Sequence, residues 1–172
     1  MNKRLLFYGV ILLQVLFLLG MAGSYFAIDK VGQEIRLKTI PIDPRDLFYG
    51  DYVTLQYEIS NVPKKLWLSE ELPDYGDRVY VLVDKGETYH KVVAASLEKL
   101  EVGEGEVLLS GRYLYEVDTS ALFVEYGIEQ YYIPENTGKE IENSSGNVEV
   151  YVKIAPWGQM KIDRIVEVDE KK

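Results

Sequence analysis

The sequence predicts a mainly β fold, with a single exported domain shaped as a barrel or a sandwich and one N-terminal transmembrane helix. Two observations support this prediction. Residues 5–28 contain no charged side chain, whereas the rest of the chain alternates apolar and polar residues in short segments separated by Gly or Pro. The 172 residues suffice for one domain with its own core but not for two domains beside an anchor.

The uncharged segment has the length of a transmembrane helix. At about 1.5 Å per residue, 5–28 would cross a hydrocarbon layer of roughly 30 Å with some tilt. Lys3 and Arg4 precede this segment, and the basic flank of a single span normally stays in the cytoplasm. We therefore expect residues 1–4 in the cytoplasm and 29–172 outside the cell membrane, with the lipid bilayer as a partner.

A cleaved signal peptide is the alternative interpretation of this segment. Its apolar stretch is longer than the roughly 7–15 residues of a typical signal peptide. The possible cleavage positions also place Met21 or Tyr25 where a small side chain is needed. Uncleaved anchoring is therefore favoured, and the absence of cysteine excludes both a lipid-modified cysteine and a disulfide.

Small residues recur near the outer end of the same segment. Gly20 with Ser24, and Gly23 with Ala27, have the four-residue spacing that lets two transmembrane helices approach closely. Gln14 adds a polar group in mid-membrane that would prefer a protein partner to lipid. This face predicts contact with another membrane helix.

Alternating segments predict the strands of the exported domain. Along 51–60, Val53, Leu55, Tyr57 and Ile59 occupy one parity, so we expect one half-buried strand with Leu55 and Tyr57 facing the core. A C-terminal hairpin is predicted from 148–154 and 160–168, which are joined by a turn at 156–158. Weaker strands are expected at 36–39, 78–84, 89–95, 107–115 and 122–126, and short helical turns at 64–72 and 137–142.

Charge and motifs exclude several classes of function. With 19 basic and 28 acidic residues the chain has a net charge of −9, which disfavours nucleic acid and anionic lipid as partners. His90 is the only histidine, and we expect its imidazole on a strand surface and not on a metal. Neither a calcium-binding loop motif nor a glycine-rich phosphate motif occurs, so we expect no metal and no cofactor.

A polar loop precedes the clearest strand. Two prolines stiffen its start, and Asp43, Arg45 and Asp46 follow, with Asp51 just before the strand. These four side chains could form a binding site at the mouth of the β domain. Alternatively, Arg45 bridges the loop carboxylates and only holds the turn in place.

The next residues carry a family resemblance. Gly50, Asp51, Tyr52, Leu55 and Tyr57 stand at every defining position of the bacterial GDYXXLXY proteins, which this chain resembles. The lead-in to this motif and the segment 126–135 are also similar to that family. The resemblance implies a membrane-anchored protein of unassigned biochemical function, often encoded near a multi-span membrane protein.

Aromatic residues suggest a second candidate surface. Tyr131, with Tyr126, Tyr132 and the intervening Glu129, could recognise a partner or could simply line a sheet. We expect the two tryptophans, Trp67 and Trp157, to fill gaps in the core or to cover the barrel. The candidate ligand or partner residues are Asp43, Arg45, Asp46, Asp51, Tyr52, Glu129 and Tyr131.

The signature region also resembles the catalytic box of signal peptidase I, a Ser/Lys protease. That box needs a Ser-Met pair before its proline, but Ile42 and Asp43 stand there, so no nucleophile is present and we predict no catalytic residue. The leading hypothesis is a non-enzymatic accessory protein that assembles with a multi-span membrane protein or an envelope component. A small-ligand or cation sensor is the alternative, and a hydrolase ranks third.

Overall fold

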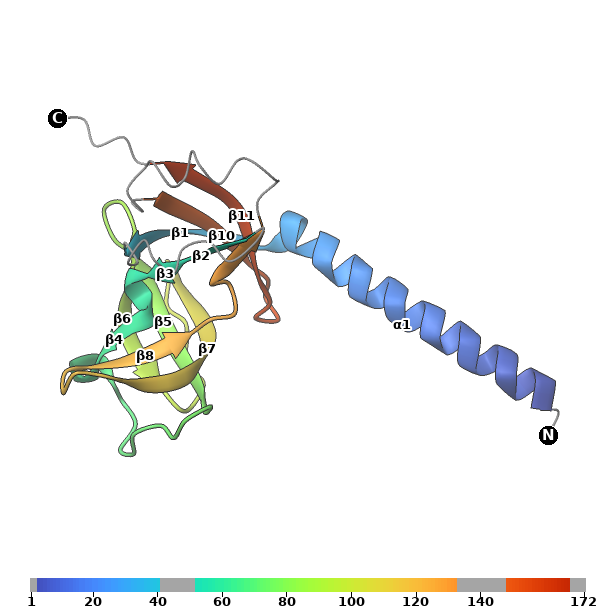
Figure 1. Cartoon of the computed structure of the whole chain (residues 1–172), viewed down its shortest axis with the longest axis horizontal. Helices are drawn as coiled ribbons and strands as arrows, with labels where there is room; N and C mark the ends of the chain where they lie inside the picture. The colour runs from blue at the N-terminus through green and yellow to red at the C-terminus, as the bar shows by residue number, and fades with distance from the viewer. Residues whose placement is uncertain (1–2, 41–51, 133–147, 168–172) are drawn as a thin grey trace.

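The computed structural model describes residues 3–40, 52–132 and 148–167. A single long helix projects from a β domain whose strands wrap into a nearly closed, barrel-like arrangement (Figure 1). The predicted fold class is therefore confirmed.

The helix α1 spans Lys3–Val31 and exceeds the predicted segment by a turn at its C-terminal end. Its Leu6–Val31 portion has a mean hydropathy of 2.2 and is long and apolar enough to cross a membrane, a property that signal sequences share. The extra turn begins with Asp29, which forms ion pairs with the β domain.

The first sheet includes the strand that directly follows the helix. Its order is β11-β10-β1-β3, and all its pairs are antiparallel. The predicted C-terminal hairpin is confirmed within the described residues, and the predicted strand 36–39 lies inside β1. The strands are β1 (Gln33–Ile40), β3 (Gln56–Tyr57), β10 (Val148–Ile154) and β11 (Met160–Glu167).

The second sheet has the order β4-β8-β7-β5-β6, and a short ladder joins β2 to β9. The predicted strands 78–84, 89–95, 107–115 and 122–126 all occur here with small shifts in their ends. The strands outside the first sheet are β2 (Tyr52–Thr54), β4 (Asn61–Pro63), β5 (Arg78–Lys85), β6 (His90–Ser96), β7 (Glu106–Val117), β8 (Ala121–Glu125) and β9 (Gln130–Tyr132).

The expectation of one continuous strand over 51–60 is wrong. The chain from Tyr52 to Pro63 passes instead through β2, β3, the 3-10 helix η2 (Glu58–Ser60) and β4, so it crosses from one sheet to the other. The alternation still predicted burial correctly, because Leu55 and Tyr57 both lie in the core. A pattern of period two reports burial without showing where the backbone changes its partner strand.

The expected helix at 64–72 is also shorter than predicted. Only the 3-10 helix η3 (Lys64–Leu66) forms, because Trp67 then bridges to Ala95 of β6. The Trp67 indole donates a hydrogen bond to the carbonyl oxygen of Glu71 at 2.9 Å and packs against the core, as expected of a gap-filling tryptophan. The expected turn at 137–142 lies outside the described residues.

Trp157 does not fill a gap in the core, since 52% of this residue is exposed. It lines a groove together with the core residues Val107 and Leu109, so its expected role in covering the barrel stays a prediction. The amide of Gly158 donates to the carbonyl oxygen of Ala155 at 2.8 Å, and Gly158 has a φ of +90°. This turn places Pro156 and Trp157 at the tip of the β10–β11 hairpin. A turn residue has no sheet partner to bury it.

Candidate functional site

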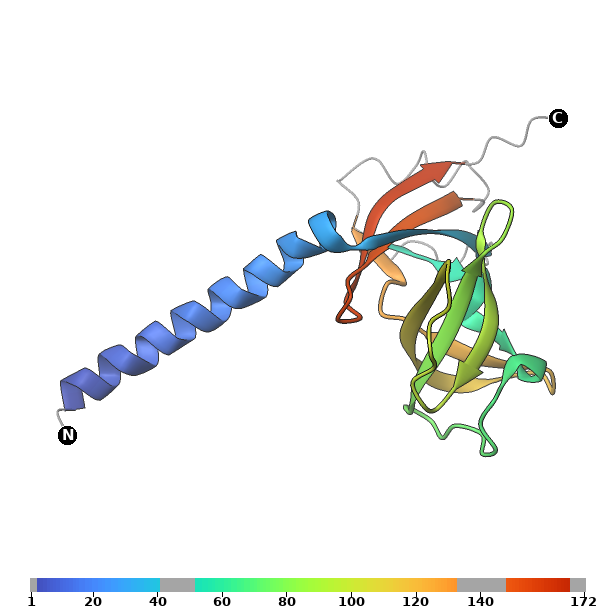
Figure 2. The ribbon, with the colours of Figure 1, turned by 180° about the vertical axis from the view of Figure 1, so that it is seen from behind.

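The junction between α1 and β1 is short and closely packed. Ile28 is fully buried, and the amide of Gly32 donates to its carbonyl oxygen at 2.8 Å. A Cβ at position 32 would lie 2.4 Å from that oxygen and 3.3 Å from the Cβ of Lys153, so only glycine fits without a shift. Because β1 begins at Gln33, no flexible linker separates the helix from the sheet (Figure 2).

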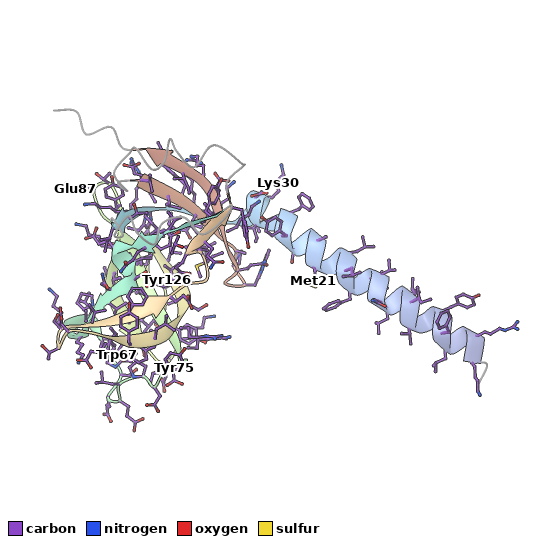
Figure 3. The ribbon with its side chains drawn as sticks, viewed as in Figure 1. Met21, Lys30, Trp67, Tyr75, Glu87 and Tyr126 are labelled. Carbon is purple, nitrogen blue, oxygen red and sulfur yellow. The ribbon has the colours of Figure 1, made fainter. Side chains whose placement is uncertain are left out.

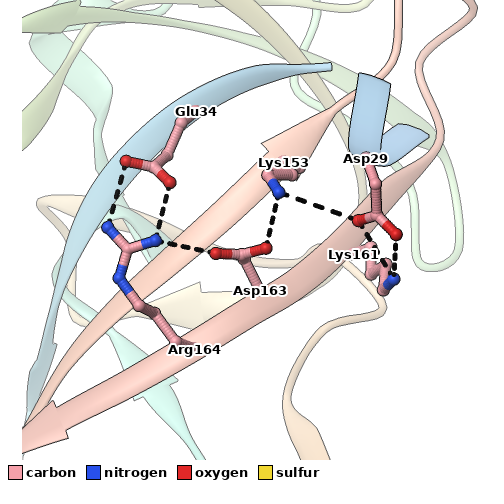
Figure 4. A network of polar contacts seen from close by, with 6 residues as sticks. All are labelled: Asp29, Glu34, Lys153, Lys161, Asp163 and Arg164. Atoms are coloured by element: carbon pink, nitrogen blue, oxygen red, sulfur yellow. Dashed lines mark hydrogen bonds and ion pairs between the residues drawn. The ribbon is translucent and has the colours of Figure 1, made fainter. Parts of the chain in front are cut away.

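Ion pairs bind the last turn of the helix to the C-terminal hairpin (Figure 4). The carboxylate of Asp29 lies 3.0 Å from Nζ of Lys161 and 3.8 Å from Nζ of Lys153. The Lys161 ammonium also lies 4.4 Å from the centroid of the Tyr25 ring, within cation–π range. The hairpin thus contacts α1 through two successive turns, which fixes the direction of the helix relative to the sheet.

The same network continues across the sheet. Asp163 accepts from Lys153 and from Arg164 at 2.7 Å each, and Arg164 also pairs with Glu34 at 2.9 Å. The Arg164 guanidinium stacks 3.8 Å from the centroid of the Tyr151 ring. Exposed pairs of this kind contribute little individually, so we assign the network an orienting role more than a stabilising one.

The described part of the signature segment links β3 of the first sheet to the turn that follows β8 of the second sheet, and we call these contacts the clamp. The Tyr57 side chain is fully buried, and its hydroxyl donates to the carbonyl oxygen of Ile128 at 2.7 Å. The amide of Leu55 donates to the carbonyl oxygen of Glu129 at 2.6 Å, and the Tyr126 hydroxyl donates to Ile59 at 2.8 Å. Burial raises the pKa of both phenols, so they stay protonated and act as donors.

Glu129 closes the turn between β8 and β9. Its carboxylate oxygens accept from the amides of Tyr126 at 2.5 Å and Gly127 at 2.7 Å. Burial raises the pKa of the Glu129 carboxyl, although these amide hydrogen bonds oppose the shift. These hydrogen bonds hold the turn at 126–129, to which Leu55 and Tyr57 of the signature segment also bond.

The sequence analysis missed a buried acid on β10. Glu149 of β10 is 5% exposed, and its carboxylate accepts from the Arg36 guanidinium and, at 2.5 Å, from the Tyr89 hydroxyl. Burial raises the pKa of Glu149, but the bonds from Tyr89 and Arg36 lower it by more, so the net shift is downward. The strand alternation placed Glu149 on the polar face, and nothing in the sequence signals that the turn carrying Tyr89 covers it.

The expectation that His90 lies on a strand surface is wrong, because this residue is buried. Its Nδ1 accepts a hydrogen bond from the amide of Arg36 at 3.2 Å, which links β6 to β1 where their backbones do not pair. Burial lowers the pKa of the imidazole, which favours the neutral ring. No group of three or more metal-ligating side chains occurs among the described residues.

The structure brings together three of the predicted site residues. Tyr52 pairs with Tyr132, next to Tyr131, in the ladder between β2 and β9, and Glu129 immediately precedes β9. Tyr131 packs against the core, and Tyr132 is largely exposed. Asp43, Arg45, Asp46 and Asp51 lie outside the described residues, so their convergence stays a prediction.

The predicted helix-packing residues lie on α1. A Cβ at Gly20 or Gly23 would meet nothing within 4 Å in this chain, so that surface is open to a second helix. Ser24 donates its hydroxyl to the carbonyl oxygen of Met21 at 2.8 Å, which satisfies this polar group within the helix. Ala27 lies one turn further along, beside the junction.

Fold and site together define a small β domain carried on one apolar helix long enough to span a membrane. The signature segment joins its sheets. The family model described as GDYXXLXY protein matches residues 14–165, and the chain belongs to this family. Comparisons with curated proteins and with solved structures find no match.

Proposed function

We propose that this protein is a non-enzymatic accessory protein, anchored by α1, which holds its domain in a fixed orientation on the outer face of the cell membrane beside a multi-span membrane protein. The proposal rests on the close packing of the junction between α1 and β1. Gly32, the buried Ile28 and the ion pairs of Asp29 couple the helix directly to the sheet. A tether needs no such coupling, whereas a domain that must meet a membrane partner in one orientation does.

The open small-residue face of α1 supports a helix partner. Gly20 and Gly23 leave the backbone accessible, and close backbone approach is what favours association of helices in lipid. The outward orientation of the domain is supported by the basic N-terminal flank of the helix. Envelope components remain an alternative class of partner.

Cysteine cross-linking in native membranes tests the proposal, because the chain contains no cysteine of its own. We expect Ser24→Cys, which hardly changes side-chain size, to cross-link to a larger membrane protein with a short bifunctional maleimide. Ala22→Cys is the matched control, since a two-residue step turns the side chain to the opposite side of the helix. Equal adducts at both positions, or none at either, would count against a specific helix partner.

A further inference from the structure

The β10–β11 hairpin reaches back toward the membrane-spanning helix. Gln33, the first residue of β1, pairs with Ile154, so the turn at 155–159 extends past the point where α1 ends. Figures 1 and 2 show this turn projecting on the side of the domain from which α1 leaves. On the returning strand, Lys161 contacts the ring of Tyr25, which belongs to the apolar part of the helix.

The hairpin tip and its neighbours expose apolar side chains there. Val31, the last residue of α1, and Val102, in the loop before β7, are 55% and 52% exposed. Together with Trp157 they line a groove of about 510 Å³. The Trp157 indole N–H donates to Oε1 of Gln159 at 3.1 Å, which holds the half-exposed ring at the tip.

Two basic side chains and one acidic side chain line this groove, and the loop that carries Lys99 and Val102 also exposes Glu98, Glu101 and Glu104. Lys99 and Arg78 line it, and both are exposed. Glu106 is the acid among the described residues that line the groove, and its carboxylate accepts from the amide of Gly103 at 2.7 Å. An exposed tryptophan with apolar neighbours and long basic side chains nearby suits the boundary between acyl chains and lipid headgroups.

We propose that Val31, Lys99, Val102 and Trp157 form a juxtamembrane surface that contacts the lipid headgroup layer of the leaflet from which α1 emerges. Because the surface begins at the last residue of α1, the nearest available occupant is that lipid. Trp157 would lie at the headgroup boundary and Lys99 beside the phosphates. This inference rests on the proposed function only in that α1 must span the membrane.

Tryptophan fluorescence of the full chain in phosphatidylcholine vesicles tests the surface. The chain has two tryptophans, so Trp67→Phe leaves Trp157 as the reporter. The matched control combines Trp67→Phe, Trp157→Phe and Glu87→Trp. Its single tryptophan lies in the exposed β5–β6 turn, which Figure 3 places away from α1.

We expect lipids brominated near the headgroup to quench Trp157 strongly, lipids brominated near the acyl terminus to quench it less, and neither to quench position 87. Equal quenching at positions 157 and 87 in a chain that resists carbonate extraction would overturn this inference alone. Extraction of the chain by carbonate would overturn the membrane anchoring and this surface together.

A second measurement keeps Trp67 in place in case Trp67→Phe does not fold. Trp157→Cys and Glu87→Cys each accept a nitroxide label, because no other cysteine competes. Collision with lipid-soluble oxygen should dominate at position 157 and collision with a water-soluble nickel complex at position 87. Water-like accessibility at both positions would contradict the proposed contact.

Discussion

Tyr57→Ala is expected to lower the free energy of unfolding by about 3–5 kcal/mol, the range observed when large buried aromatic side chains are truncated. Tyr57 is fully buried between the two sheets, so the cavity forms where the signature segment clamps them. Tyr57→Phe removes only the hydroxyl and leaves the carbonyl oxygen of Ile128 without this donor, which costs about 1–3 kcal/mol.

Urea denaturation of the full chain in detergent, followed by circular dichroism, measures both variants of Tyr57. The larger loss for Ala than for Phe separates the packing of the ring from the hydrogen bond of its hydroxyl. A Tyr57→Phe protein as stable as the wild type would show that the bond to Ile128 contributes nothing. That result would contradict the role assigned to the Tyr57 hydroxyl in holding the two sheets together.

Glu149→Gln is expected to cost about 1.5–3 kcal/mol, as for hydrogen bonds to a buried charge. The side chain accepts from Arg36 and Tyr89 and is nearly inaccessible to water. The Arg36 side chain, however, is 34% exposed, which keeps the loss below the about 3–5 kcal/mol of a fully buried broken pair. Glu34→Gln is the matched control. It breaks the exposed pair with Arg164 and should cost about 0–1 kcal/mol.

The same substitution has an expected pH dependence. Because the pKa of Glu149 is lower in the folded protein, its ionisation stabilises the fold above the ordinary carboxyl value of 4.5. This contribution is lost as the pH falls below that value through the lowered pKa. Denaturation midpoints of wild type and Glu149→Gln should therefore converge in acid. A gap that stays constant from neutral pH to pH 3 would contradict the ion pair.

The sequence predicted burial and hairpins well and changes of backbone partner poorly. Leu55 and Tyr57 faced the core as their alternation indicated, and the hairpin around Trp157 formed where Pro and Gly placed a turn. The break between β2 and β3 was not predictable, because the chain changes its partner strand there. The amide of Leu55 still bonds to Glu129 beside β9, whereas Gln56 and Tyr57 pair with β1, and both partners are distant in the sequence. Local patterns carry no information about such distant partners.

The buried polar residues also show that local sequence patterns do not reveal distant partners. Glu149 and His90 both lie in alternating strands, yet the structure buries them because the β5–β6 hairpin packs against β1 and β10. Burial of Glu149 follows from how the two sheets meet, not from the residues beside it. The tip position of Trp157, in contrast, could have been inferred from the Pro-Trp-Gly turn itself.

We infer that α1 remains attached as an anchor and holds the domain outside the cell membrane. Labelling of Tyr75→Cys in intact cells with a membrane-impermeant maleimide tests it directly, because Tyr75 is highly exposed and the chain has no other cysteine. We expect label on a membrane-bound chain of the full 19.7 kDa before the cells are lysed. A shorter, soluble labelled product, or labelling only after lysis, would contradict the account.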